Sequence, residues 1–76
     1  MDILNDSLIG KYVILRDNRF GGLCSGRYIG NHQWEKDGTR YHYFRGGTVG
    51  VTDQGNGMHG FPVARIAEFE LVEVLG

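Results

Sequence analysis

The stretch HQWEKDGTRYHYF, from His32 to Phe44, sets an Asp-Gly pair between two runs rich in aromatic residues. A type I′ turn needs positive φ at both of its central positions, and Asp-Gly adopts that geometry at little cost. The stretch therefore predicts a tight β-hairpin whose two-residue loop is Asp37-Gly38. In the register that this loop implies, Trp34 faces Tyr41.

The predicted register also decides which side chains share a face of the hairpin. Glu35 and Arg40 are expected to oppose each other as an ion pair, which agrees with the register because opposite charges stabilise a cross-strand pair. Since side chains alternate along a strand, one face is aromatic and the other is mostly polar. The aromatic face consists of His32, Trp34, Tyr41 and Tyr43, and the other face of Gln33, Glu35, Arg40, His42 and Phe44.

Length and composition indicate a single small β domain over residues 1–76. The chain has 76 residues, including 13 glycines and one proline, which is typical of many turns. A chain of this size buries only about 60–65% of its unfolded surface, so it has one small core and little room for a deep active site. Its one cysteine, Cys24, excludes an internal disulfide. The absence of a long apolar run and of basic residues at the N-terminus predicts a cytoplasmic protein.

The charge is unevenly distributed along the chain, although the net charge is only −1. Residues 11–45 contain seven basic and three acidic residues, a balance of +4, and the remainder carries one basic and six acidic residues, a balance of −5. Two interpretations stay open. Either the acidic and basic parts offset each other in the fold, or a basic face is left exposed for an acidic partner.

Two strands are expected before the hairpin stretch. Gly10–Asp17 is a short β-branched and aromatic run bounded by turn residues, so we expect a strand there and a turn at Asn18–Gly22. Leu23–Asn31 is expected to be the second strand. Gly26 and Gly30 inside it predict bulges or bends of the kind that a small barrel needs at its corners.

The glycine-rich segment Gly46–Gly60 is expected to hold a short strand at Thr48–Thr52 and a flexible loop. Its GNGMHG run, from Gly55 to Gly60, matches the GxGxxG pattern of dinucleotide-binding sites. That pattern works only where a strand leads into a helix, and Phe61-Pro62 follows where the helix would run. We therefore expect no cofactor and interpret the segment as a loop between antiparallel strands.

The C-terminal segment, FPVARIAEFELVEVL, fits two patterns. Apolar residues at helical spacing favour a helix that begins near the proline, whereas EFELVEVL alternates at period two and is rich in β-branched residues, which favours a strand. The combined prediction is one short helical turn at Val63–Ala67, followed by a closing strand at Glu68–Leu75.

The order of these elements resembles the small SH3-like barrels, including their Sm-like variants. The resemblance rests on the GKYVIL run in the first strand, a glycine-containing second strand, a tight hairpin, and a P-x-x-x-I turn that leads into EFELVEV. It implies an all-β fold, a five-stranded and partly open SH3-like barrel with one short helical turn before the last strand. Such barrels bind proteins or nucleic acids or form assemblies, so the resemblance implies a binding module.

The sequence shows no pattern typical of an enzyme or a metal site. His32 and His42 are expected on opposite faces of the hairpin, and His59 lies in the glycine-rich segment, so no shared metal site is predicted. Cys24 is expected to be a small buried apolar residue rather than a nucleophile. We predict a protein without catalytic activity, cofactor, metal or membrane contact.

Two functions remain from different classes. The first is a protein-interaction or assembly module, which binds another protein or a second copy of itself through the aromatic face and the glycine-rich loop. The second is nucleic-acid binding, with aromatic rings stacked on bases and arginines on phosphates. The small size also suits an accessory gene of a phage or mobile element. The predicted binding residues are Tyr28, Trp34, Tyr41, Tyr43, Arg27 and Arg40. Whether the aromatic face is core or contact surface stays open, since a barrel of this size also needs those rings for its core.

Overall fold

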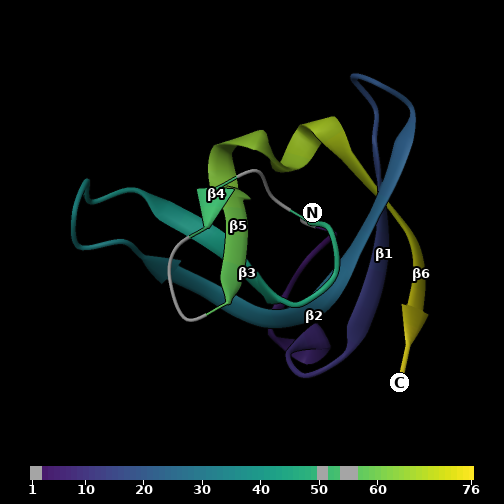
Figure 1. Ribbon diagram of the computed structural model, residues 1–76, viewed down its shortest axis with the longest axis horizontal. Helices are drawn as coiled ribbons and strands as arrows, with labels where there is room; N and C mark the ends of the chain where they lie inside the picture. The colour runs from purple at the N-terminus through teal and green to yellow at the C-terminus, as the bar shows by residue number, and fades with distance from the viewer. Residues whose placement is uncertain (1–2, 50–51, 54–56) are drawn as a thin grey trace.

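The computed structural model describes residues 3–49, 52–53 and 57–76 (Figure 1). These residues form one antiparallel sheet in the order β4-β5-β3-β2-β1-β6. The strands are β1 (Tyr12–Asp17), β2 (Gly22–Gln33), β3 (Arg40–Arg45), β4 (Thr52–Asp53), β5 (Met58–Pro62) and β6 (Phe69–Leu75). Two short 3-10 helices accompany them, η1 (Asp6–Leu8) and η2 (Val63–Glu68). The predicted all-β, barrel-like fold with a helical turn directly before the last strand is confirmed.

The long strand β2 bends the sheet. Its first half pairs with β1, and its second half pairs with β3. The register shifts between Tyr28 and Gly30, and Gly30 has a φ of 110°, so the bulge predicted at this glycine is confirmed. At Gly26 the pairing is regular instead; a side chain there would meet the Gly46 carbonyl oxygen at 3.0 Å, so this glycine permits a close approach rather than a bulge.

The core lies inside the curled sheet, and η2 joins β5 to the edge strand β6 (Figure 1). Its aromatic centre is continuous, because the rings of Phe61 and Phe69 stack at 4.2 Å between centroids and Phe44 stacks on Phe61 at 5.8 Å. The buried apolar residues are Leu4, Val13, Leu15, Tyr28, Phe44, Val49, Phe61 and Phe69. This core supplies the main driving force for folding, since it removes large aromatic surfaces from water.

The glycine-rich segment differs from its prediction. Thr48 and Val49 are not in a strand, and the middle of the predicted strand, residues 50–51, lies outside the described residues. The segment instead leads into β5, which pairs with β3 over its whole length. The glycine at position 60 reflects this pairing: a Cβ there would lie 2.3 Å from the His42 carbonyl oxygen. A bulkier residue would push β5 away from β3, so tertiary packing, not a local strand pattern, accounts for the glycine.

The hairpin forms, but its predicted loop is wrong. His32 pairs with Tyr41, so the loop has four residues, Glu35–Gly38, instead of two. Thr39 donates its backbone N–H to the Asp37 carboxylate at 2.9 Å, and only Gly38 adopts a positive φ, at 72°. The aspartate therefore organises a four-residue loop, for which one left-handed glycine is enough.

The new register moves the partners of β3 by two residues along β2. A shift of two keeps every side chain on its predicted face, because the side-chain period of a strand is two. The opposition of Glu35 and Arg40 is wrong, however, since Arg40 lies opposite Gln33. Its guanidinium donates instead to Asn31 Oδ1, at 3.0 Å from Nε and 2.8 Å from Nη2.

Candidate interaction surface

Four rings form a row on the outer face of the hairpin. Trp34 and Tyr41 meet edge to face, with 5.8 Å between centroids and 87° between planes. The row continues from Tyr41 to Tyr43 at 6.0 Å and from Tyr43 to His32 at 6.0 Å. We call these four residues the aromatic strip. They are the aromatic face that the sequence predicts.

The aromatic strip faces away from the core. Along β3, Tyr41 and Tyr43 alternate with His42 and Phe44, and the latter two point into the barrel, where they are 1% and 0% exposed. Trp34 and Tyr41 are half-buried and His32 is exposed, whereas Tyr43 is buried in the middle of the strip. The open question about the aromatic face is thereby answered: its rings lie outside the main core, and Tyr43 anchors them to the sheet.

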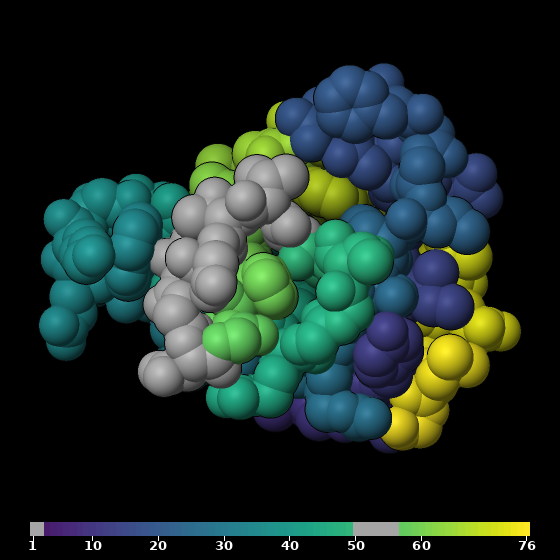
Figure 2. Space-filling model, viewed as in Figure 1, coloured from purple at the N-terminus to yellow at the C-terminus, as the bar shows by residue number. Residues whose placement is uncertain are grey.

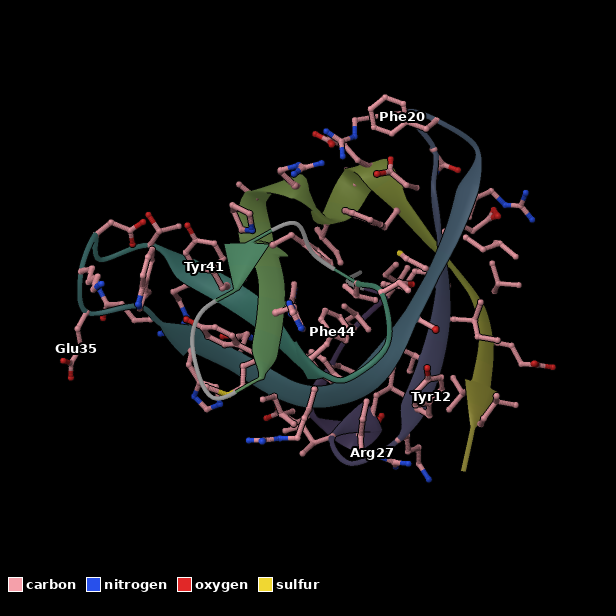
Figure 3. The ribbon with its side chains drawn as sticks, viewed as in Figure 1. Tyr12, Phe20, Arg27, Glu35, Tyr41 and Phe44 are labelled. Atoms are coloured by element: carbon pink, nitrogen blue, oxygen red, sulfur yellow. The ribbon has the colours of Figure 1, made fainter. Side chains whose placement is uncertain are left out.

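The hairpin carries part of this strip away from the body of the protein. In Figure 2 its tip forms a separate projection at the left. Figure 3 shows Tyr41 at the base of this projection and Glu35 at its end, with Phe44 well inside the barrel. The strip is therefore accessible from the side of the molecule, without any opening of the fold.

The loop at the tip is held by its own polar contacts. The Asp37 carboxylate accepts the Tyr41 hydroxyl at 3.2 Å, and Gln33 donates its amide to the Gly38 carbonyl at 2.9 Å. Burial, and then the nearby Asp37 charge, raise the pKa of Tyr41, which favours the protonated hydroxyl that donates to Asp37. The Lys36 ammonium lies 5.7 Å from the centre of the Trp34 ring. These contacts hold the Tyr41 ring in place and set the Lys36 ammonium beside the Trp34 ring.

Tyr28 is not part of the strip, although simple alternation along β2 sets it on the same face as Trp34. The bulge between Tyr28 and Gly30 reverses the alternation, so Tyr28 points inward and is 0% exposed. Its hydroxyl lies 2.8 Å from His42 Nδ1. Tyr28 therefore serves the core.

Neither predicted arginine lies with the strip. Arg40 lies on the opposite face of the hairpin, where it contacts Asn31. Arg27 lies in the middle of β2 opposite Tyr12, as Figure 3 shows, and donates to the Gly10 carbonyl at 2.6 Å. Of the six predicted binding residues, the structure brings together Trp34, Tyr41 and Tyr43.

One neighbour of the strip was missed in the sequence. Ile9 is 49% exposed, and its Cδ1 lies 3.3 Å from the point where a Cβ on Gly30 would stand, next to the His32 ring. It precedes the first strand, so no strand pattern indicated its position. The glycine at position 30 is the one local feature that could have indicated this contact, since the absence of a side chain leaves the space that Ile9 occupies.

The charges of the two parts of the chain meet around β1 and β6. Arg16 lies 3.6 Å from Glu70, and Arg19 lies 3.0 Å from Glu68 and 2.8 Å from Asp17. The hydrogen bond from Arg19 lowers the pKa of Asp17. Of the two interpretations, these contacts favour the one in which the basic and acidic parts offset each other. They disfavour the one in which a basic face is left exposed.

The described residues show neither a metal-binding cluster nor a pocket. Within residues 3–49, 52–53 and 57–76, no three His, Cys, Asp or Glu side chains gather where they could hold a metal ion, and no pocket is found. Cys24 is half-buried, and burial raises the pKa of its thiol, which disfavours the reactive thiolate. Neither helical segment among the described residues has the length and apolar character needed to cross a membrane.

Comparison with known proteins finds no matching family model, no matching curated protein and no matching solved structure. The fold itself defines the class: a small all-β, barrel-like protein with an aromatic strip on its outer face.

Proposed function

We propose that this protein is a non-catalytic binding module that contacts a partner protein through the aromatic strip. The observation that carries the proposal is the perpendicular pair of Trp34 and Tyr41, 5.8 Å apart, on a projecting hairpin and on the face opposite the core. Tryptophan and tyrosine contribute most of the binding free energy at many protein interfaces. A pair of them outside the core is best explained by a surface that a partner covers.

The loop contacts support this role. Asp37 holds both the Thr39 backbone and the Tyr41 hydroxyl, at 2.9 and 3.2 Å, so the rings are positioned before a partner arrives. Ordering flexible side chains on binding costs free energy, and a preformed surface reduces that cost. A strip used only for solubility or for loop closure has no need of this arrangement.

The fold agrees with a binding role. The strand order β5-β3-β2-β1-β6, with a helical turn before β6, resembles the SH3-like barrels, and we propose that the chain belongs to this architecture. The glycine-rich segment stays in the proposed site because β5, which begins within it, lies directly beside Tyr41 and Tyr43. The free Cys24 thiol suits the reducing cytoplasm, where we propose that the protein acts.

Single-stranded nucleic acid is the second candidate, because successive rings about 6 Å apart offer bases a stacking surface. The arginines argue against it. Five arginines contact groups of the protein itself, which disfavours a row of phosphate-binding cations beside the strip. These five are Arg16, Arg19, Arg27, Arg40 and Arg65.

The decisive experiment combines capture with matched variants. The full chain, immobilised, is exposed to an extract of its source cells, and the captured protein is then purified and titrated by calorimetry. We expect Trp34→Ala and Tyr41→Ala each to weaken binding roughly 30-fold or more, as hot-spot residues do. Phe20→Ala, at an equally apolar position that is 79% exposed but far from the strip, should change binding little.

A parallel titration tests the second candidate. Oligo(dT) and oligo(U) are added at low ionic strength while the fluorescence of Trp34 is followed. We expect no change, because the strip lacks phosphate contacts. Quenching of Trp34 that disappears steeply with added salt would show that the partner is a nucleic acid and not a protein. In the calorimetric experiment, equal binding of the captured protein by Trp34→Ala, Tyr41→Ala and Phe20→Ala would show that the strip is not the binding site.

A further inference from the structure

The strand β6 forms one edge of the sheet. β1 pairs with one side of β6, and in the described parts of the chain no strand lies on its other side. Figure 1 shows this free side facing away from the body of the protein. An open edge presents unpaired backbone N–H and C=O groups, which a strand from another chain can complete.

The side chains of this edge are unusually apolar for a solvent-exposed strand. Val72, Val74 and Leu75 are 44%, 38% and 45% exposed, and they are half of the six large apolar residues exposed in the described ranges. Charges protect edge strands in many proteins, and here Glu70 and Glu73 supply them. The edge therefore combines apolar contact area with two carboxylates, and a partner must accommodate both.

A bulge divides β6 into two parts. Ile14 pairs with Glu73 and Leu15 pairs with Leu71, so Val72 has no direct partner on β1. The bulge sets Leu71 and Val74 on the same face, since they pair with the buried Leu15 and Val13.

The bulge also decides which residues of β6 lie on the outward face of the sheet. Glu70 and Leu75 lie on it together, because they pair with Arg16 and Tyr12, which alternate with the buried residues of β1. On either side of the bulged Val72, the inward positions are thus Phe69, Leu71 and Val74, and the outward positions are Glu70, Glu73 and Leu75.

We propose that β6 pairs antiparallel with β6 of a second copy, about a two-fold axis between Val72 and Glu73. In this register Leu71 lies opposite Val74 of the second copy, with both on the core side of the sheet. Glu70 lies opposite Leu75 of the second copy, with both on the outer side. The bulge makes these faces agree, so two identical strands form one continuous sheet.

No glutamate directly opposes another glutamate in this register, and the two Glu73 residues lie diagonally across the two-fold axis. Each glutamate faces an apolar residue: Glu70 faces Leu75, and Glu73 faces Val72, each of the second copy. Like charges that face each other directly destabilise a strand pair, and this register avoids them. Arg16, 3.6 Å from Glu70 in each copy, offsets part of the remaining negative charge.

The expected dimer is small and reversible. Pairing of one seven-residue strand buries less than the standard interface of about 1,600 Å². The aromatic strip lies on β2 and β3, away from β6, so the dimer exposes two strips at once. This inference does not depend on the proposed function, although a dimer with two strips would bind a partner that has two sites more tightly.

The test introduces a charge at position 72, because Val72 faces Glu73 of the second copy in the proposed register. Sedimentation equilibrium of the full chain should show a monomer–dimer equilibrium. Val72→Asp adds two like-charge pairs per dimer and should raise the dimer Kd roughly 2- to 30-fold, whereas Val72→Lys adds two opposite-charge pairs and should lower it by a similar factor. A purely structural role of Val72 would shift both variants in the same direction.

Matched controls isolate the surface. Phe20→Asp and Phe20→Lys make the same charge changes at a position that is 79% exposed in the β1–β2 turn, and they should leave the dimer Kd unchanged. Circular dichroism confirms that each variant is folded, and if Val72→Asp does not fold, the tightening by Val72→Lys decides alone. Trp34→Ala should also leave the dimer intact, which separates this test from that of the proposed function.

Four results would overturn the proposal. They are a wild-type chain that stays monomeric up to about 1 mM, where even weak complexes form; an assembly larger than a dimer; shifts of the same sign for both Val72 variants; and loss of the dimer in Trp34→Ala. A monomer would leave the partner-binding experiment unaffected, because that experiment reads only the aromatic strip.

Discussion

The Tyr28 hydroxyl lies 2.8 Å from Nδ1 of His42, and both side chains are almost wholly buried. This contact joins β2 to β3 inside the core, on the face opposite the aromatic strip. A buried polar group that loses such a hydrogen bond costs far more than the same group in water.

Tyr28→Phe keeps the ring and removes only the hydroxyl. We expect a loss of about 1–3 kcal/mol in the free energy of unfolding, because the buried imidazole loses this hydrogen bond. Urea denaturation measures it. Tyr12→Phe is the matched control, since its hydroxyl contacts Ser25 Oγ at 2.9 Å in a partly buried site and should cost about 1 kcal/mol or less. Equal effects of the two variants would contradict the special position of Tyr28.

Two phenylalanines test where the core ends. Phe61 is 2% exposed and stacks between Phe44 and Phe69, so Phe61→Ala should cost about 3–5 kcal/mol. In a protein of this size that loss approaches the whole stability, and thermal denaturation should show a partly unfolded chain. Phe20→Ala, at a position 79% exposed, should change stability by about 0.5 kcal/mol or less. A large effect at Phe20 would mean that the turn packs against the core.

Gly38 occupies the one left-handed position of the hairpin loop, with a φ of 72°. Gly38→Ala should therefore cost about 1–2 kcal/mol, because a Cβ is strained in that conformation. Gly22→Ala is the control, since Gly22 has an ordinary φ and open space around its Cα. Melting temperatures compare the two. If Gly38→Ala is as stable as Gly22→Ala, the left-handed conformation of Gly38 is incorrect.

The pair of Asp17 and Arg19 predicts how stability depends on pH. The hydrogen bond from Arg19, whose Nη2 lies 2.8 Å from Asp17 Oδ2, holds the pKa of this carboxyl below its ordinary value. A carboxyl with a lowered pKa in the folded state stabilises the protein above the unfolded pKa of about 3.9, and the stabilisation is lost as the pH falls through the folded pKa. Asp17→Asn should therefore flatten the acid side of the stability–pH curve, with no effect on its slope above pH ~6. An unchanged acid slope in urea titrations would show that this pair contributes nothing.

Trp34 is the one tryptophan of the chain, so its fluorescence reports directly on the strip. Half-buried on the outer face, it should be quenched by acrylamide to an intermediate degree in the free protein. Binding of the captured partner should reduce that quenching, because the ring becomes covered. Tyr41→Ala should increase quenching in the free protein, since it removes the ring that meets Trp34 edge to face. Full protection in the free monomer would contradict an open strip.

Local patterns predicted much of the hairpin and of the C-terminal segment. The period of two along Tyr41–Phe44 separates the rings of the strip from those of the core, and this separation survives the change of register because that change is even. Pro62 and the alternation after it predicted the helical turn and β6 to within one residue. These features depend on neighbours in the chain, so they can be read from it.

The sequence by itself thus determined that an all-β chain carries an aromatic face on a hairpin and ends in a closing strand. Only the tertiary structure decided that Tyr28 belongs to the core, because one bulged residue before Gly30 reverses the alternation of β2. It also decided that Arg27 and Arg40 contact groups of the protein itself, and that β5 pairs with β3, where the nearby His42 carbonyl leaves room only for a glycine at position 60. Each of these outcomes depends on residues far apart in the chain, and spacing along a single strand carries no information about such contacts.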